Sequence, residues 1–156
     1  MSKITIIGPG AIGGLIATWL SQDSDHEVSV AVRTPFSRLE LETPDGHLEA
    51  WPQILTNPGQ ALPADWALLA TKAYDSAAAA AWFAGTVTGR TQVAVLQNGV
   101  DHVDRISEWV PRDRILPVIV DCPTERLAPG NIRQRGQVTL RTPVTPLAES
   151  FAALFT

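Results

Sequence analysis

The chain has 156 residues, of which 45% are hydrophobic and 18% charged, and its formal net charge at pH 7 is −4. This balance is typical of a globular domain, the acidic net charge argues against nucleic acid as a partner, and no apolar run reaches the roughly 18 residues of a membrane span. Cys122 is the single cysteine, so we expect neither an internal disulfide nor a cysteine-based metal site. We expect a cytoplasmic protein, because a strand begins too early for a signal peptide.

A glycine motif lies between a predicted strand, residues 3–7, and a predicted helix that ends near Leu20. In this context three spaced glycines indicate a dinucleotide-binding turn, although a glycine turn that binds nothing is the alternative. Gly8 would permit the tight turn, Gly10 the close approach of a pyrophosphate, and Gly13 the close packing of helix on strand. The first-turn N–H groups and the helix dipole would then face the phosphates. The loop residues expected to bind the cofactor are Gly8, Pro9, Gly10, Ala11, Ile12 and Gly13.

A second strand is predicted over residues 27–32, which gives a βαβ unit with parallel strands. Arg33 follows it directly, at the place where NAD-binding folds carry a carboxylate for the ribose 2′-hydroxyl. An arginine there suits the 2′-phosphate of NADP, so we expect NADP as the cofactor. The alternative is that Arg33 and Arg38 are solvated surface residues.

Further elements follow the same α/β pattern. Alternating residues on both sides of a Pro-Asp-Gly turn predict a hairpin over 39–50, with a short strand over 53–56. Apolar runs predict buried parallel strands, and helical propensity predicts helices between them. These strands are expected at 66–71, 92–96 and 115–120, and the helices at 75–83 and 101–109. The expected fold class is α/β, a Rossmann-like doubly wound parallel sheet.

The last part of the chain changes character. A turn signal at residues 128–130 predicts an antiparallel segment appended to the sheet, to which residues 138–140 could add a strand. Thr145 as N-cap and Pro146 at the first helical position predict a helix over 145–156. We expect its apolar face to be uncovered and to favour a homo-oligomer. That face comprises Leu147, Phe151, Leu154 and Phe155. The three histidines are expected at the surface.

Lys72 and Asn98 each follow a predicted buried strand, as the glycine loop and Arg33 do. Ligands of open parallel sheets bind outside the carboxyl ends of the strands, so these four features are expected at one site. Lys72 is a compact positive charge suited to phosphate. Asn98 offers a donor and an acceptor for ribose, the nicotinamide amide or a polar substrate. Taken singly, Lys72 could equally be a surface lysine and Asn98 part of a turn.

These segments together resemble a known family. Residues 3–13, Arg33, and the stretches 71–74 (Thr-Lys-Ala-Tyr), 96–100 (Leu-Gln-Asn-Gly-Val) and 129–132 (Pro-Gly-Asn-Ile) are similar to the amino-terminal domain of ketopantoate reductase. The resemblance implies NADPH-dependent reduction of ketopantoate, a small 2-oxo acid, to pantoate on the route to pantothenate. It also implies that the glycine loop holds the pyrophosphate, Arg33 meets the 2′-phosphate and Lys72 lies on the cofactor side. Asn98 would lie between the nicotinamide ribose and the substrate.

The resemblance stops short of the family's second, all-helical domain, which carries a catalytic lysine and a substrate-binding glutamate. We therefore assign no catalytic residue, and we expect residues 1–156 to form an NADP-binding domain in which 145–156 begin a helix toward the missing domain. Such a chain would bind nucleotide but reduce ketopantoate very poorly alone. The alternatives are a related reductase acting on another keto acid and a nucleotide-binding or regulatory module without catalysis. A flavin-binding domain is a further alternative, against which Arg33 argues.

Overall fold

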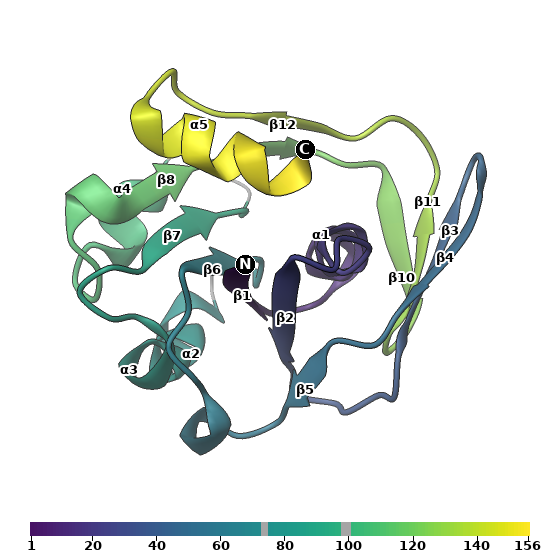
Figure 1. Ribbon diagram of the computed structural model, residues 1–156, viewed down its shortest axis with the longest axis horizontal. Helices are drawn as coiled ribbons and strands as arrows, with labels where there is room; N and C mark the ends of the chain where they lie inside the picture. The colour runs from purple at the N-terminus through teal and green to yellow at the C-terminus, as the bar shows by residue number, and fades with distance from the viewer. Residues whose placement is uncertain (73–74, 98–100) are drawn as a thin grey trace.

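The computed structural model describes residues 1–72, 75–97 and 101–156 (Figure 1). Its centre is a six-stranded parallel sheet in the order β5-β2-β1-β6-β7-β8. The strand order reverses between β1 and β6, which is where ligand crevices open in sheets of this kind. The strands are β1 (Ser2–Ile7), β2 (His26–Ala31), β5 (Gln53–Leu55), β6 (Trp66–Leu69), β7 (Gln92–Val95) and β8 (Ile115–Pro117).

Both faces of this sheet are covered, which confirms the predicted doubly wound α/β class. Alternate residues of β6 face opposite sides: Trp66 and Leu68 belong to one core, Ala67 and Leu69 to the other. Helices α1 (Ala11–Leu20) and α5 (Pro146–Ala152) pack on the first side. The other side is covered by α2 (Ser76–Ala79), the 3₁₀ turn Ala80–Trp82, α3 (Phe83–Thr86) and α4 (His102–Ile106).

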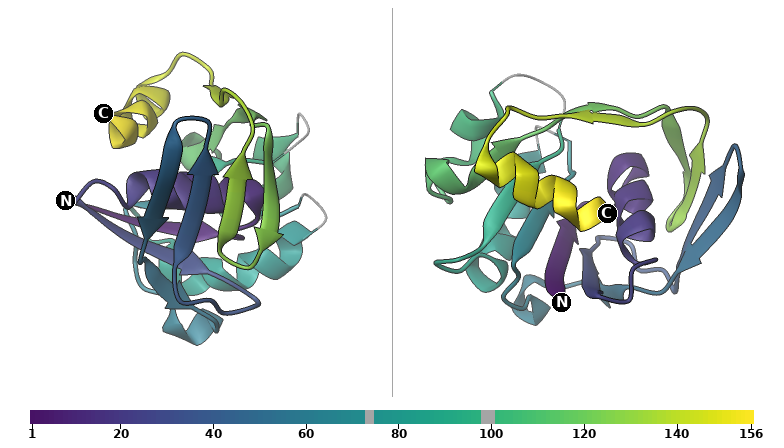
Figure 2. Two further views of the ribbon diagram at one scale, coloured as in Figure 1. Left: turned by 90° about the vertical axis from the view of Figure 1, so that its right-hand side faces the viewer. Right: turned by 45° about the horizontal axis from the view of Figure 1, so that its top comes forward.

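The predicted hairpin of residues 39–50 is confirmed as β3 (Leu39–Thr43) and β4 (Gly46–Ala50). The predicted antiparallel segment is also present, as β10 (Thr124–Ala128) and β11 (Asn131–Gln134), but it does not extend the parallel sheet. Instead β11 pairs parallel with β3, and the two hairpins form a second, four-stranded sheet. Figure 2 (left) shows this sheet lying across α1.

Two predicted elements differ from the structure. The strand expected over 115–120 is two strands. The first, β8, pairs with β7, and the chain turns away from β7 after the Val118 N–H donates a hydrogen bond to the Val95 carbonyl. The second of them, β9 (Ile119–Asp121), pairs with β12 (Thr139–Arg141). The helix expected over 75–83 is interrupted by the 3₁₀ turn, since alanine propensity favours a helix without fixing its hydrogen-bond pattern. The helix expected over 101–109 ends early, at Ile106.

The carboxyl-terminal helix α5 begins as predicted, with the Thr145 hydroxyl accepting the Ala148 N–H at 3.1 Å. The prediction that its apolar face is uncovered is wrong for Phe151 and Leu154, which are buried, with the Phe151 ring centroid 5.5 Å from that of Trp66. Phe155 of the same face is 37% exposed. Self-association through this face stays a prediction. None of the helices in the described part of the chain has the length and apolar composition of a membrane span.

Candidate functional site

A cleft of about 570 Å³ lies at the carboxyl ends of the parallel strands. The loop from Gly8 to Ile12 lines it, together with Arg33 after β2 and Lys72 after β6. Gly13 is buried in α1. The structure thus brings together most of the residues expected at the cofactor site. Asn98 lies outside the described residues, so its place remains a prediction.

The three glycines of the motif meet different surroundings. Gly8 has φ +84°, and a Cβ there would lie 2.4 Å from Thr71 Cγ2. A Cβ on Gly13 would lie 2.5 Å from the Gly8 carbonyl oxygen, so the helix packs tightly on the turn. A Cβ on Gly10 would have no described atom within 4 Å. Gly8 and Gly13 are therefore required by the fold, whereas Gly10 leaves open space at the cleft.

The amino terminus of α1 opens at this cleft. Gly10 is the N-cap and provides no side-chain cap, and no acidic residue lies in the first turn. The first N–H groups of a helix have no partner within the helix, and they carry the positive end of its dipole. An anion is the favoured occupant of such a position.

The charges that line the cleft also favour an anion. Three of them are cationic, Arg33, Lys72 and Arg126, and one is the carboxylate of Asp75. The Arg33 side chain is 78% exposed, and its guanidinium lies 3.3 Å from the Asp75 carboxylate. Arg126 lies on β10 and was not predicted from the sequence, because only the docking of the second sheet over α1 brings it to the cleft.

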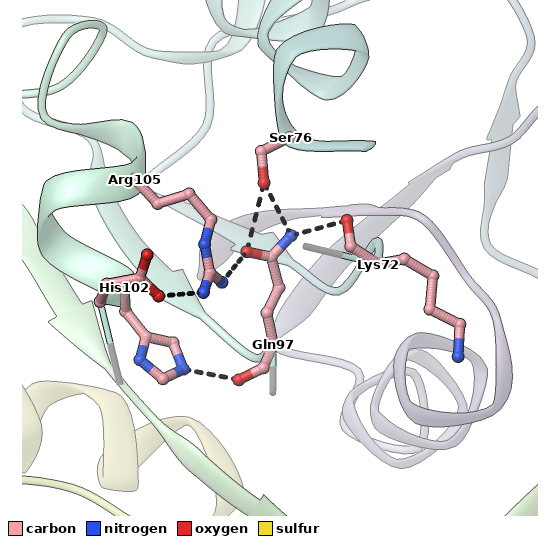
Figure 3. Close-up of polar contacts among 6 residues, drawn as sticks. Lys72, Ser76, Gln97, His102 and Arg105 are labelled. Atoms are coloured by element: carbon pink, nitrogen blue, oxygen red, sulfur yellow. Dashed lines mark hydrogen bonds and ion pairs between the residues drawn. The ribbon is translucent and has the colours of Figure 1, made fainter. Parts of the chain in front are cut away.

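A buried glutamine, Gln97, lines the cleft and joins neighbouring segments through hydrogen bonds (Figure 3). Gln97 follows β7 and is only 3% exposed. Its Nε2 lies within hydrogen-bond distance of Thr71 Oγ1 (3.0 Å), Ser76 Oγ (3.1 Å) and the Lys72 carbonyl (3.3 Å). Its Oε1 accepts from Arg105 at 2.9 Å. The amide therefore ties the end of β7 to the Lys72 backbone, while the Lys72 side chain points away from the cluster (Figure 3).

Helix α4 completes this cluster. Arg105 forms an ion pair with Asp101, whose pKa lies below its ordinary value because of a backbone hydrogen bond and then because of Arg105. His102 is 2% exposed, with its Nε2 2.5 Å from the Gln97 carbonyl oxygen. The expectation of surface histidines is therefore wrong for His102, and also for His26, whose Nε2 contacts the Leu154 carbonyl. Gln97 was not predicted as a site residue, although a polar residue just after a buried strand could have indicated it.

Replacing Gln97 with leucine is expected to lower the free energy of unfolding by about 2 kcal/mol, because buried polar partners lose their hydrogen bonds. For a chain of this length the unfolding temperature should fall by roughly 4–8 °C. Thermal unfolding followed by circular dichroism measures the change, with the exposed Gln137→Leu as the matched control. Equal unfolding temperatures for the two variants would contradict this role of Gln97.

Two other features lie away from the cleft. A second cleft of about 570 Å³, lined in part by Trp19, Leu140 and Phe155, lies near the carboxyl end of α1. On the second sheet, Glu40, His47 and Glu49 place potential ligand atoms within 4.8 Å of one another. Glu40 is already paired with Arg38, whose positive charge disfavours a cation there, so we assign no metal to these residues.

A family model and two curated relatives give this chain's similarity to known proteins. The family model for ketopantoate reductase PanE/ApbA matches residues 4–145. A 2-dehydropantoate 2-reductase of Caulobacter vibrioides is 46% identical over 155 residues, which cover 99% of this chain and 53% of the relative. The enzyme of the same name from Mycobacterium tuberculosis is 35% identical over 153 residues, 97% of this chain and 52% of the relative. The chain spans about half the length of these curated relatives.

Solved structures agree on the fold. A PanE/ApbA family ketopantoate reductase from Ralstonia eutropha is 27% identical, with a TM-score of 0.87 over 98% of this chain and 53% of the other. A 2-dehydropantoate 2-reductase from Porphyromonas gingivalis, 24% identical, gives 0.87 over 99% and 60%. A D-mandelate dehydrogenase solved with NADH and anilino(oxo)acetate, 22% identical, gives 0.81 over 98% and 53%.

Proposed function

Because this chain belongs to the ketopantoate reductase family, a family of oxidoreductases, we propose that its cleft binds NADP for the reduction of a small 2-oxo acid. Ketopantoate is the proposed substrate, reduced to pantoate for pantothenate synthesis in the cytoplasm. One observation carries the proposal: a single cleft joins the open backbone at Gly10 to the cations Arg33 and Lys72.

Each residue has a proposed task in this cleft. Gly10 and the amino terminus of α1 would hold the pyrophosphate, and Arg33 would meet the 2′-phosphate. Lys72 would lie along the cofactor, with its backbone fixed because its carbonyl accepts from both Gln97 and the Asp75 N–H, the latter at 2.9 Å. Asn98 is proposed between the ribose and the substrate. The bound nicotinamide supplies the hydride.

The proton that carbonyl reduction also requires is not assigned to a described residue. The chain spans about half of its curated relatives, so we propose for it the nucleotide-binding part of the reaction. With Arg33 and Lys72 committed to the cofactor, residues 1–156 alone should turn over ketopantoate poorly. NADPH oxidation by the purified chain measures this.

Calorimetric titration with NADPH and NADH tests the proposal. We expect NADPH to bind about tenfold more tightly, since a phosphate–guanidinium contact this exposed is worth only about 1.4 kcal/mol. Arg33→Ala should bring the two affinities close together. Arg38→Ala is the matched control, because Arg38 pairs with Glu40 on the second sheet. If neither nucleotide binds, the proposed nucleotide-binding role is wrong. If both bind with equal affinity, only the choice of NADP over NAD is wrong.

A further inference from the structure

Arg33 already has an anionic partner inside the cleft. The Asp75 carboxylate lies 3.3 Å from its guanidinium, although Arg33 lies between β2 and β3 and Asp75 lies between β6 and α2. Asp75 precedes α2 as its N-cap, where an aspartate ordinarily accepts a backbone N–H of the first turn. Its side chain makes no such capping bond here. The carboxylate is directed to Arg33 instead of to its own helix.

The position of Asp75 is fixed more firmly than that of Arg33. Its N–H donates to the Lys72 carbonyl at 2.9 Å, the same carbonyl that Gln97 holds. Its side chain is 26% exposed, whereas that of Arg33 is 78% exposed. The Asp75 carboxylate is therefore held in the cleft wall, whereas the exposed Arg33 side chain can change its conformation.

We propose that Asp75 limits the preference of this cleft for NADPH over NADH, as the counter-ion that a 2′-phosphate must displace from Arg33. The inference rests on the proposed function. A 2′-phosphate bound to Arg33 brings negative charge beside the carboxylate, and like charges repel. The free 2′-hydroxyl of NADH can instead donate a hydrogen bond to a carboxylate at this end of the ribose. Asp75 thus lowers the ratio of the NADH dissociation constant to the NADPH dissociation constant, so that NADH can still bind.

The test compares Asp75→Asn, which preserves shape and removes the charge, with the unsubstituted chain. We expect the dissociation constant for NADPH to fall about threefold to tenfold, while that for NADH stays the same or rises. Raising the salt concentration should shrink the difference. Asp113→Asn removes the same charge from an exposed position outside the cleft, and it should leave both constants unchanged.

A second variant guards against a folding effect. Asp75→Ser also removes the charge and keeps a small polar side chain, so it should shift the ratio of the two constants in the same direction. If both nucleotides bind and neither variant changes the ratio, the inference is overturned and the proposed function stands. Equal weakening of both nucleotides would make Asp75 a structural residue and also overturn it. If the unsubstituted chain binds neither nucleotide, the proposed function falls and the inference with it.

Discussion

Replacing Gly10 with alanine is expected to weaken nucleotide binding at least about tenfold while leaving the unfolding temperature of the free chain unchanged. Gly10 has φ −72°, which lies outside the left-handed region that favours glycine. The added methyl group meets no described atom within 4 Å, so the free chain has nothing to rearrange. The methyl would occupy the space through which a pyrophosphate must approach the backbone. Calorimetry with NADPH and thermal unfolding without ligand measure the two effects.

Gly89→Ala is the matched control for this experiment. Gly89 also has open space at the Cβ position, and it lies in the turn between α3 and β7, outside the cleft. It should change neither binding nor stability by more than a small amount. Normal NADPH affinity in Gly10→Ala would mean that the glycine loop is only a turn.

Replacing Gly13 with alanine is expected to have the opposite signature, a loss of about 2–3 kcal/mol in the free energy of unfolding. The new Cβ would lie 2.5 Å from the Gly8 carbonyl oxygen and 3.1 Å from Ala70 Cβ. Both atoms belong to packed segments, so α1 must shift away from β1 and β6. The unfolding temperature should drop by roughly 5–10 °C.

Gly10→Ala serves as the control for Gly13→Ala, because it adds the same methyl group at the start of the same helix. Chemical denaturation of both variants gives the difference directly. If Gly13→Ala unfolds at the same denaturant concentration as Gly10→Ala, the packing of α1 on the turn tolerates a methyl group at position 13 and this prediction is wrong.

The parallel sheet and its first turn could be predicted because their signals are local. Ile4 and Ile6 alternate toward one core, and the run of residues 66–69 is buried on both faces, as its composition indicates. Arg33 and Lys72 reach the cleft because each lies within three residues of the end of a parallel strand, and such strands end at one edge of the sheet. Proximity in the chain to a strand end was therefore enough to place them.

The remaining features depend on contacts between distant segments. The apolar side of α5 was read as uncovered because nothing in residues 145–156 shows that Phe151 will meet Trp66. Arg126 reaches the cleft only through the second sheet. Asp75 was read as the first residue of a helix, and its pairing with Arg33 joins two loops that no local pattern connects.

The pairing of β11 with β3 also has a consequence for the order in which the chain can fold during synthesis. Its register joins Ile132 to Leu41, and Arg133 reaches Glu42 at 2.8 Å across 91 positions of sequence. Ile132 is also the side chain that lies against Gly14 of α1. While the ribosome is still adding the central strands, the hairpin of β3 and β4 has no partner strand, and α1 is open on that side. Contacts this far apart form late and leave apolar surface exposed meanwhile, so the nascent chain is most prone to aggregation until residues 131–134 have emerged.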